Sequence, residues 1–252
     1  MLQAKSNYYR RLAPRRGVRP RGDVPPLTID QWLSGLGDPA RVVVVAAGPT
    51  ARDLVPQADS LHVATNSSEA VVHEHTYVNF LTEGYPVTRY LKNGPASSSC
   101  RGTFFRFETR GRPQSQTTVA RRAVADTRRF LRACPDVVSS DVDEDGVERD
   151  NFERYQEEIL RLTGMEMRQY NSGFGATYLG LFLAATFQVP LEIYGLDAGV
   201  GGQKHFDGSQ MESPSVVGER VRGNLKILLD LLYRQERVEV TNRSAFYPEP
   251  EA

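Results

Sequence analysis

The sequence predicts an α/β fold built on a doubly wound, mainly parallel, Rossmann-like sheet. Strand-like and helix-like segments alternate along most of the chain. The clearest strand lies in "RVVVVAAGPT", a β-branched run with no polar face, as expected of a strand that helices cover on both sides. A chain of 252 residues can also bury a substantial core within one domain.

The remaining elements follow in a regular order. A helical turn begins at Ala51, and "LHVATN" and "TYVNF" are two more strand-like segments. Helices are predicted at 151–162, 172–187 and 216–234, and strands at "PLEIYG" and "RVEVTN". Such an alternation indicates parallel strands joined by right-handed crossovers. Inside the second helix, Gly175 and Gly180 are predicted to permit close packing against the sheet.

We expect a single α/β domain at 28–245, between a basic flexible tail at 1–27 and a short tail at 246–252. Within the domain, "GPASSSCRGT" and "RGRPQSQTT" are typical of loops, and "VARRAVADTRRFLRAC" predicts a basic amphipathic helix. The stretch at about 94–150 is therefore predicted to be a small inserted lid. The first tail carries seven Lys or Arg before its first acid at Asp23, which indicates a solvated arm or a contact with an acidic membrane surface or nucleic acid.

Composition and charge exclude several classes of protein. The 31 basic and 31 acidic residues balance, so a nucleic-acid partner is not indicated. Two cysteines cannot form a disulfide framework, which favours a reducing, cytoplasmic setting, membrane-peripheral if the basic tail binds lipid. The longest apolar stretch, 178–194, is interrupted by polar residues and falls short of the ~20 residues of a membrane span. The sequence leaves the oligomeric state open.

Candidate binding residues lie directly after the predicted strands, where ligands bind in open parallel sheets. They are Gly48, Pro49, Thr50, Asn66, Asn79, Ser172, Gly173 and Asp197. Glycine admits a ligand close to the backbone, and the start of a helix offers N–H groups to a phosphate. An ordinary turn explains "AAGPT" equally well, and Asn is a common helix cap. Asp197 is predicted either to orient a ribose or sugar or to cap the next turn.

The usual nucleotide-binding fingerprints are absent from the chain. Neither GxGxxG nor GxxxxGK[ST] occurs, which argues against the common dinucleotide-binding and P-loop proteins. The acidic run "DVDEDGVERD" lacks the spacing of an EF-hand, so we predict no metal site there. His62, His73 and His75 come early in the chain and are predicted to be structural.

Taken in order, these stretches resemble the bacterial sialyltransferases of glycosyltransferase family 42. In that family a strand leads into a Gly-Asn-Gly-Pro-Ser loop, two further strands end at or near Asn, and Thr-Ser-Gly opens a helix before a strand that ends in Gly-Ile-Asp. The counterparts here are "AAGPT" at 46–50, Asn66, Asn79, "NSGFGATYLGLFLA" and "EIYGLD". The resemblance spans about residues 41–242, and only the series of motifs is specific.

The resemblance implies a GT-A-like core, a CMP-linked sugar donor, no required metal or cofactor, and inverting transfer of sialic acid or a related sugar to a glycan hydroxyl. The family's general base is thought to be a histidine, and alignment from the last helix places Glu219 at its position. A base must reach the acceptor oxygen and have a pKa near the working pH, which makes His205 and Asp207 the other candidates. Lys204 would help to hold the donor phosphate.

The chain departs from the family at two points in the site. The Asn that touches the donor is Ala47 here, and the aromatic pair after Gly-Ile-Asp is Ala198 and Gly199. The segment between that strand and the final helix, which carries the base in the family, is also shorter in this chain. These differences leave the identity of the sugar open, and they make a non-catalytic nucleotide-binding protein an alternative.

A second enzyme class shares the same turns. Archaeal and bacterial relatives of 6-hydroxymethylpterin diphosphokinase have this core with its Gly-Pro and Ser-Gly turns. That activity requires ATP, magnesium and an acidic pair to hold the metal, for which Asp197 and Asp207 are the candidates. The two enzymes differ in the nucleotide they bind and in their need for magnesium.

Overall fold

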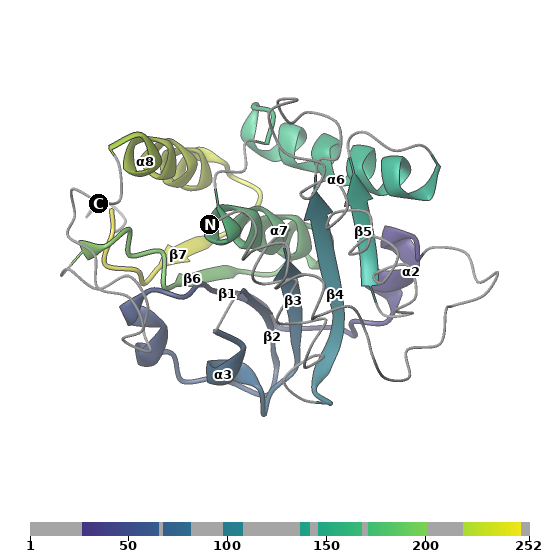
Figure 1. The fold of residues 1–252 in the computed structure, drawn as a ribbon, viewed down its shortest axis with the longest axis horizontal. Coiled ribbons are helices and arrows are strands. Elements are labelled where there is room, and N and C mark those ends of the chain that lie inside the picture. The colour runs from purple at the N-terminus through teal and green to yellow at the C-terminus, as the bar shows by residue number, and fades with distance from the viewer. Residues whose placement is uncertain are drawn as a thin grey trace, which may run out of the picture.

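The structure, a computed structural model, describes residues 27–65, 68–81, 98–107, 137–141, 146–167, 171–200 and 219–247. Within these ranges one seven-stranded sheet forms the centre of the molecule, and every neighbouring pair of strands is parallel (Figure 1). The strands are β1 (Arg41–Val45), β2 (Ser60–Ala64), β3 (Tyr77–Leu81), β4 (Cys100–Phe107), β5 (Val137–Asp141), β6 (Leu191–Tyr194) and β7 (Val240–Asn242). The predicted Rossmann-like α/β fold is confirmed.

The order of the strands creates a reversal next to β1. Across the sheet the strands run β5-β4-β3-β2-β1-β6-β7, so the chain moves outward from β1 to β5 and then continues on the other side of β1. β1 pairs with β2 on one side and with β6 on the other. The connections that leave β1 and β6 diverge at this point, which opens a crevice at the carboxyl ends of the two strands.

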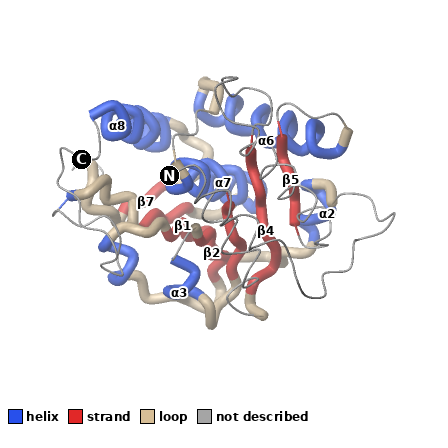
Figure 2. Tube along the Cα trace, viewed as in Figure 1, coloured by secondary structure: helices blue, strands red, loops and turns tan. Residues whose placement is uncertain are grey.

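Helices cover both faces of the sheet (Figure 2). The helices are α2 (Ile29–Ser34), the 3-10 turn η1 (Pro49–Asp53), α3 (Glu69–Val72), α6 (Val147–Thr163), α7 (Ser172–Phe187) and α8 (Glu219–Arg234). α6, α7 and α8 pack with the larger core cluster, whereas η1 and α3 pack with a smaller cluster on the opposite face. None of the helices in these described ranges is long and apolar enough to cross a membrane.

The predicted lid is corrected where the structure describes it. β4 and β5 lie between residues 94 and 150, and they pair with β3 and with each other in the main sheet. Their polar and glycine residues resemble loop sequence, but pairing with β3 places their apolar side chains, such as Phe104, in the core. The predicted basic helix lies outside the described residues.

The C-terminal boundary also differs from the prediction. A tail was expected from residue 246, yet Phe246 and Tyr247 pack against the core. Tyr247 donates a hydrogen bond to Asp230 Oδ1 at 2.7 Å, and its carbonyl accepts one from Tyr233 at 3.0 Å. The segment after β7 is thereby attached to α8.

α7 is the central helix of the larger core. Its residues from Phe174 to Ala184 are buried, because it lies across the sheet with further helices beside it (Figure 1). At Gly180 a Cβ would overlap Val44 Cγ2 and lie 3.1 Å from Leu191 Cδ1. The prediction that Gly180 permits close packing is confirmed.

We expect Gly180→Ala to lower the free energy of unfolding by about 1–3 kcal/mol, because the added methyl overpacks the contact with β1. Gly223 in α8 is the matched control, since a Cβ there meets nothing within 4 Å. Gly223→Ala should raise stability by about 0.5–1 kcal/mol through helix propensity. Urea titrations of both variants measure the difference, and stabilisation by Gly180→Ala would contradict the packing described here.

Candidate functional site

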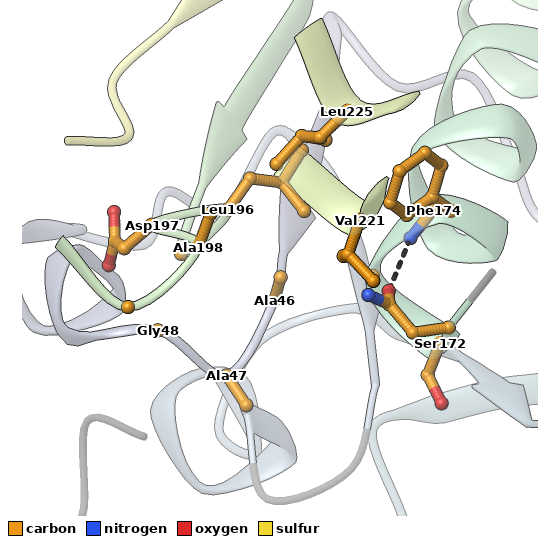
Figure 3. A pocket seen from close by; sticks show the side chains of 14 residues that line it. Ala46, Ala47, Gly48, Ser172, Phe174, Leu196, Asp197, Ala198, Val221 and Leu225 are labelled. Atoms are coloured by element: carbon orange, nitrogen blue, oxygen red, sulfur yellow. Dashed lines mark hydrogen bonds between the residues drawn. The ribbon is translucent and has the colours of Figure 1, made fainter. Parts of the chain in front are cut away.

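A cavity of about 190 Å³ lies at the carboxyl ends of β1 and β6 (Figure 3). Four segments line it: Ala46, Ala47 and Gly48 after β1; Asn171, Ser172, Gly173 and Phe174 at the start of α7; Gly195, Leu196, Asp197, Ala198 and Gly199 after β6; and Val221 and Leu225 on α8. Its position is the point of strand reversal, where ligands bind in open parallel sheets. Small side chains leave much of the lining to the backbone.

Two glycines allow the loops after β1 and β6 to touch. The N–H of Gly48 donates to the carbonyl oxygen of Gly195 at 2.9 Å. A Cβ on Gly48 would lie 2.5 Å from both that oxygen and Asp197 Oδ2. Gly195 itself has φ of 79°, and a Cβ there would overlap the backbone of Ala46. Both positions therefore require glycine for close approach of the backbone.

Asp197 joins three segments around the cavity. Its carboxylate accepts hydrogen bonds from the Thr50 N–H at 2.8 Å, the Thr50 hydroxyl at 2.7 Å and the Ala245 N–H at 2.7 Å. Thr50 Oγ1 in turn accepts from the Gly195 N–H at 2.9 Å. The side chain is 1% exposed. Of the two roles expected for Asp197, these contacts match the capping of a turn, and a metal at this carboxylate would have to displace them.

The start of α7 forms the opposite wall. Asn171 caps the helix, since its Oδ1 accepts a hydrogen bond from the Phe174 N–H at 3.1 Å. A Cβ on Gly173 would lie 3.0 Å from Leu196 Cδ2, so the helix start is in close contact with the loop after β6. The first N–H groups of a helix have no partner within the helix and carry its positive dipole end. This wall is therefore suited to a negatively charged group.

The structure brings together some of the predicted binding residues. Gly48, Ser172, Gly173 and Asp197 line the cavity, and Thr50 contacts this lining through its hydrogen bonds to Asp197. Pro49 opens η1 beside Gly48. Asn66, Lys204, His205 and Asp207 lie outside the described residues. Glu219 is exposed at the first residue of α8, and it does not line the cavity, although Val221 two residues later does.

The predicted position of Asn79 at a strand end is wrong. β3 continues to Leu81, so Asn79 lies within the strand, opposite Ala64 on β2 and Thr103 on β4. Its side chain is fully buried, and its Nδ2 donates to Cys100 Sγ at 3.7 Å. Asn79 does not line the cavity.

His62, His73 and His75 do not line the cavity. His62 is fully buried on β2, and its Nδ1 donates to the carbonyl oxygen of Thr76 at 2.9 Å. Burial lowers the pKa of His62 below its usual range; the hydrogen bond to Thr76 opposes this effect and nearby His75 adds to it. His62 is therefore held as a neutral donor in the core.

Several lining residues had no sequence signal. Leu196 is the apolar middle residue of the Gly-Leu-Asp turn, and Val221 and Leu225 belong to an amphipathic helix whose contacts depend on packing. Comparison with protein families, with curated proteins and with solved structures finds no match. Among the described residues, no cluster of three or more His, Cys, Asp or Glu is arranged to hold a metal ion.

Proposed function

We propose that the cavity binds the phosphorylated part of a nucleotide-linked sugar and that the protein is an inverting glycosyltransferase with a CMP-linked donor.

 The donor is consumed in the reaction, so it is a substrate of the enzyme. The acceptor is a glycan hydroxyl. One observation carries the proposal: the backbones at Gly48, Gly173 and Gly195 converge on a single cavity at the point of strand reversal.

The start of α7 is the part of the lining that supports a phosphate. The helix dipole and the N–H groups of its first turn favour an anion there. Leu196, Val221 and Leu225 form an apolar wall that excludes water from part of the cavity. The volume of about 190 Å³ is below the ~300–1,000 Å³ of typical ligand sites, so the described walls account for only part of the surface that a whole donor would contact.

The chemistry of inverting transfer divides into two tasks. A base removes the proton from the acceptor hydroxyl, whose oxygen attacks the anomeric carbon as the bond from that carbon to the phosphate oxygen breaks. CMP leaves with the bonding electrons, and the start of α7 would stabilise this developing charge. Glu219 is the described candidate for the base, and His205 and Asp207 are the candidates outside the described residues.

A nucleotide panel tests the proposal. Thermal shift and calorimetry with CMP, UDP, GDP and ATP, each with and without magnesium, should show protection by CMP that does not depend on magnesium. CMP-sialic acid should also release CMP slowly without an acceptor. Protection by ATP only with magnesium would instead favour the pyrophosphokinase, and CMP binding without donor hydrolysis or transfer would favour the non-catalytic alternative. No protection by any nucleotide would remove the proposal.

A substitution that fills the cavity tests whether CMP binds there. Val221 lines the cavity from α8, so Val221→Trp should weaken CMP binding by about tenfold or more through steric exclusion. Ile227, on the same helix, is 50% exposed and does not line the cavity, so Ile227→Trp is the control and should leave binding unchanged. Equal affinities of the two variants for CMP would place the nucleotide elsewhere.

A further inference from the structure

One arginine on α8 lies at the rim of the cavity. Arg222 follows Val221, a lining residue, and its Nε donates a hydrogen bond to the carbonyl oxygen of Ala198 at 3.2 Å. Ala198 also lines the cavity, from the loop after β6, and Figure 3 shows both lining residues at its border. The guanidinium is therefore attached to the wall of the cavity.

Two contacts fix the orientation of this guanidinium. The first is the hydrogen bond to Ala198, which has a left-handed backbone with φ of 49°, a conformation that is unfavourable for a residue with a Cβ. The second is the ring of Phe246, whose centroid lies 5.8 Å from the guanidinium carbon. The unfavourable turn at Ala198 and the C-terminal segment thus position the same side chain.

Neither contact neutralises the positive charge. Among the described residues no carboxylate forms an ion pair with Arg222, whereas Arg41, Arg149 and Arg161 each pair with a glutamate. Among the N–H groups of the Arg222 guanidinium, only Nε–H has an acceptor within the described residues. The two terminal nitrogens retain donors in the planar arrangement that matches two oxygens of a phosphate or carboxylate.

We propose that Arg222 binds an oxyanion of the ligand in the cavity and so selects for a charged donor. This inference rests on the proposed function. The oxyanion is either the phosphate of the nucleotide or the carboxylate of an acidic sugar. A guanidinium that the protein already orients loses little freedom when it binds, which makes it an effective contact for either group.

The experiment compares ligands that differ in charge. Cytidine, CMP and CMP-sialic acid are titrated into the wild-type protein, Arg222→Gln and Arg222→Lys, with Arg234→Gln as a control for an exposed arginine on the same helix. Arg222→Gln should weaken binding of CMP-sialic acid about tenfold or more, with an equal loss for CMP if the phosphate is the group that Arg222 contacts. Arg222→Lys should recover part of the loss, and cytidine binding should not change. Arg234→Gln should bind all three ligands as the wild type does.

The outcomes separate the two sources of the oxyanion. A loss for both CMP and CMP-sialic acid identifies the phosphate, and a loss for CMP-sialic acid alone identifies the carboxylate. If the wild type binds CMP and Arg222→Gln binds both charged ligands equally well, the role of Arg222 is overturned while the proposed function stands. If the wild type binds no nucleotide, the proposed function is wrong and the role of Arg222 is overturned with it. Thermal unfolding of each variant checks its folding, and Arg222→Lys serves if Arg222→Gln is unfolded.

Discussion

Gly195→Ala is expected to lower the free energy of unfolding by about 3–5 kcal/mol. Two costs combine at this position. The backbone has φ of 79°, which is unfavourable for any residue with a Cβ, and the new methyl would overlap the carbonyl oxygen of Ala46 and lie 2.7 Å from its carbonyl carbon. The backbone of Ala46, directly after the central strand β1, cannot move aside as a flexible side chain can.

Gly37→Ala separates the two costs. Gly37 has φ of 80°, but a Cβ there meets nothing within 4 Å. Its replacement should cost only the conformational part, about 1–2 kcal/mol. Urea unfolding followed by circular dichroism measures both variants, and the difference between them gives the cost of the contact with the Ala46 backbone. Equal losses would show that the loops after β1 and β6 are not in close contact.

Asp197→Ala is expected to destabilise the protein by about 3–5 kcal/mol, because it removes a buried carboxylate that accepts three hydrogen bonds. The N–H groups of Thr50 and Ala245 would lose their acceptor together. Hydrogen exchange should therefore speed up at these two amides as well as at Gly195, whose N–H donates to Thr50 Oγ1. The variant should also bind CMP more weakly, since the loops that line the cavity lose their common attachment.

An exposed aspartate provides the control for Asp197→Ala. Asp38 is exposed, so Asp38→Ala should change stability by less than about 0.5 kcal/mol. If Asp197→Ala kept wild-type stability and lost only CMP binding, Asp197 would act on the ligand rather than on the fold. That result would restore the other role expected for this residue.

The local sequence predicted the elements that are apolar on every side. β1 is a run of valines between covering helices, and α7 is apolar on all sides, so each could be recognised without its neighbours. The bounds of α7, Ser172–Phe187, match the prediction. β4 and β5 were missed, because serine, glycine and arginine give them the local character of loops, and their place in the sheet depends on the pairing of β4 with β3 and of β5 with β4.

The sequence predicted several residues of the candidate site, but it did not predict the contacts between them. The rule that ligands bind beyond parallel strands led to Gly48, Ser172, Gly173 and Asp197, which lie around one cavity. The same rule failed for Asn79, because β3 continues two residues past it. No pattern in the sequence indicated that Arg222 would be attached to Ala198, since the two are brought together by the packing of α8.

The sequence by itself determined the parallel α/β architecture and the turns that close it, because strand burial, helix periodicity and glycine requirements are local properties of the chain. Tertiary structure decided which of those turns meet, what Asp197 binds and which arginine lies at the cavity. These depend on contacts between segments far apart in the chain, such as the hydrogen bonds from Thr50 and Ala245 to Asp197. Such contacts form only when the order of the strands places β1, β6 and β7 side by side.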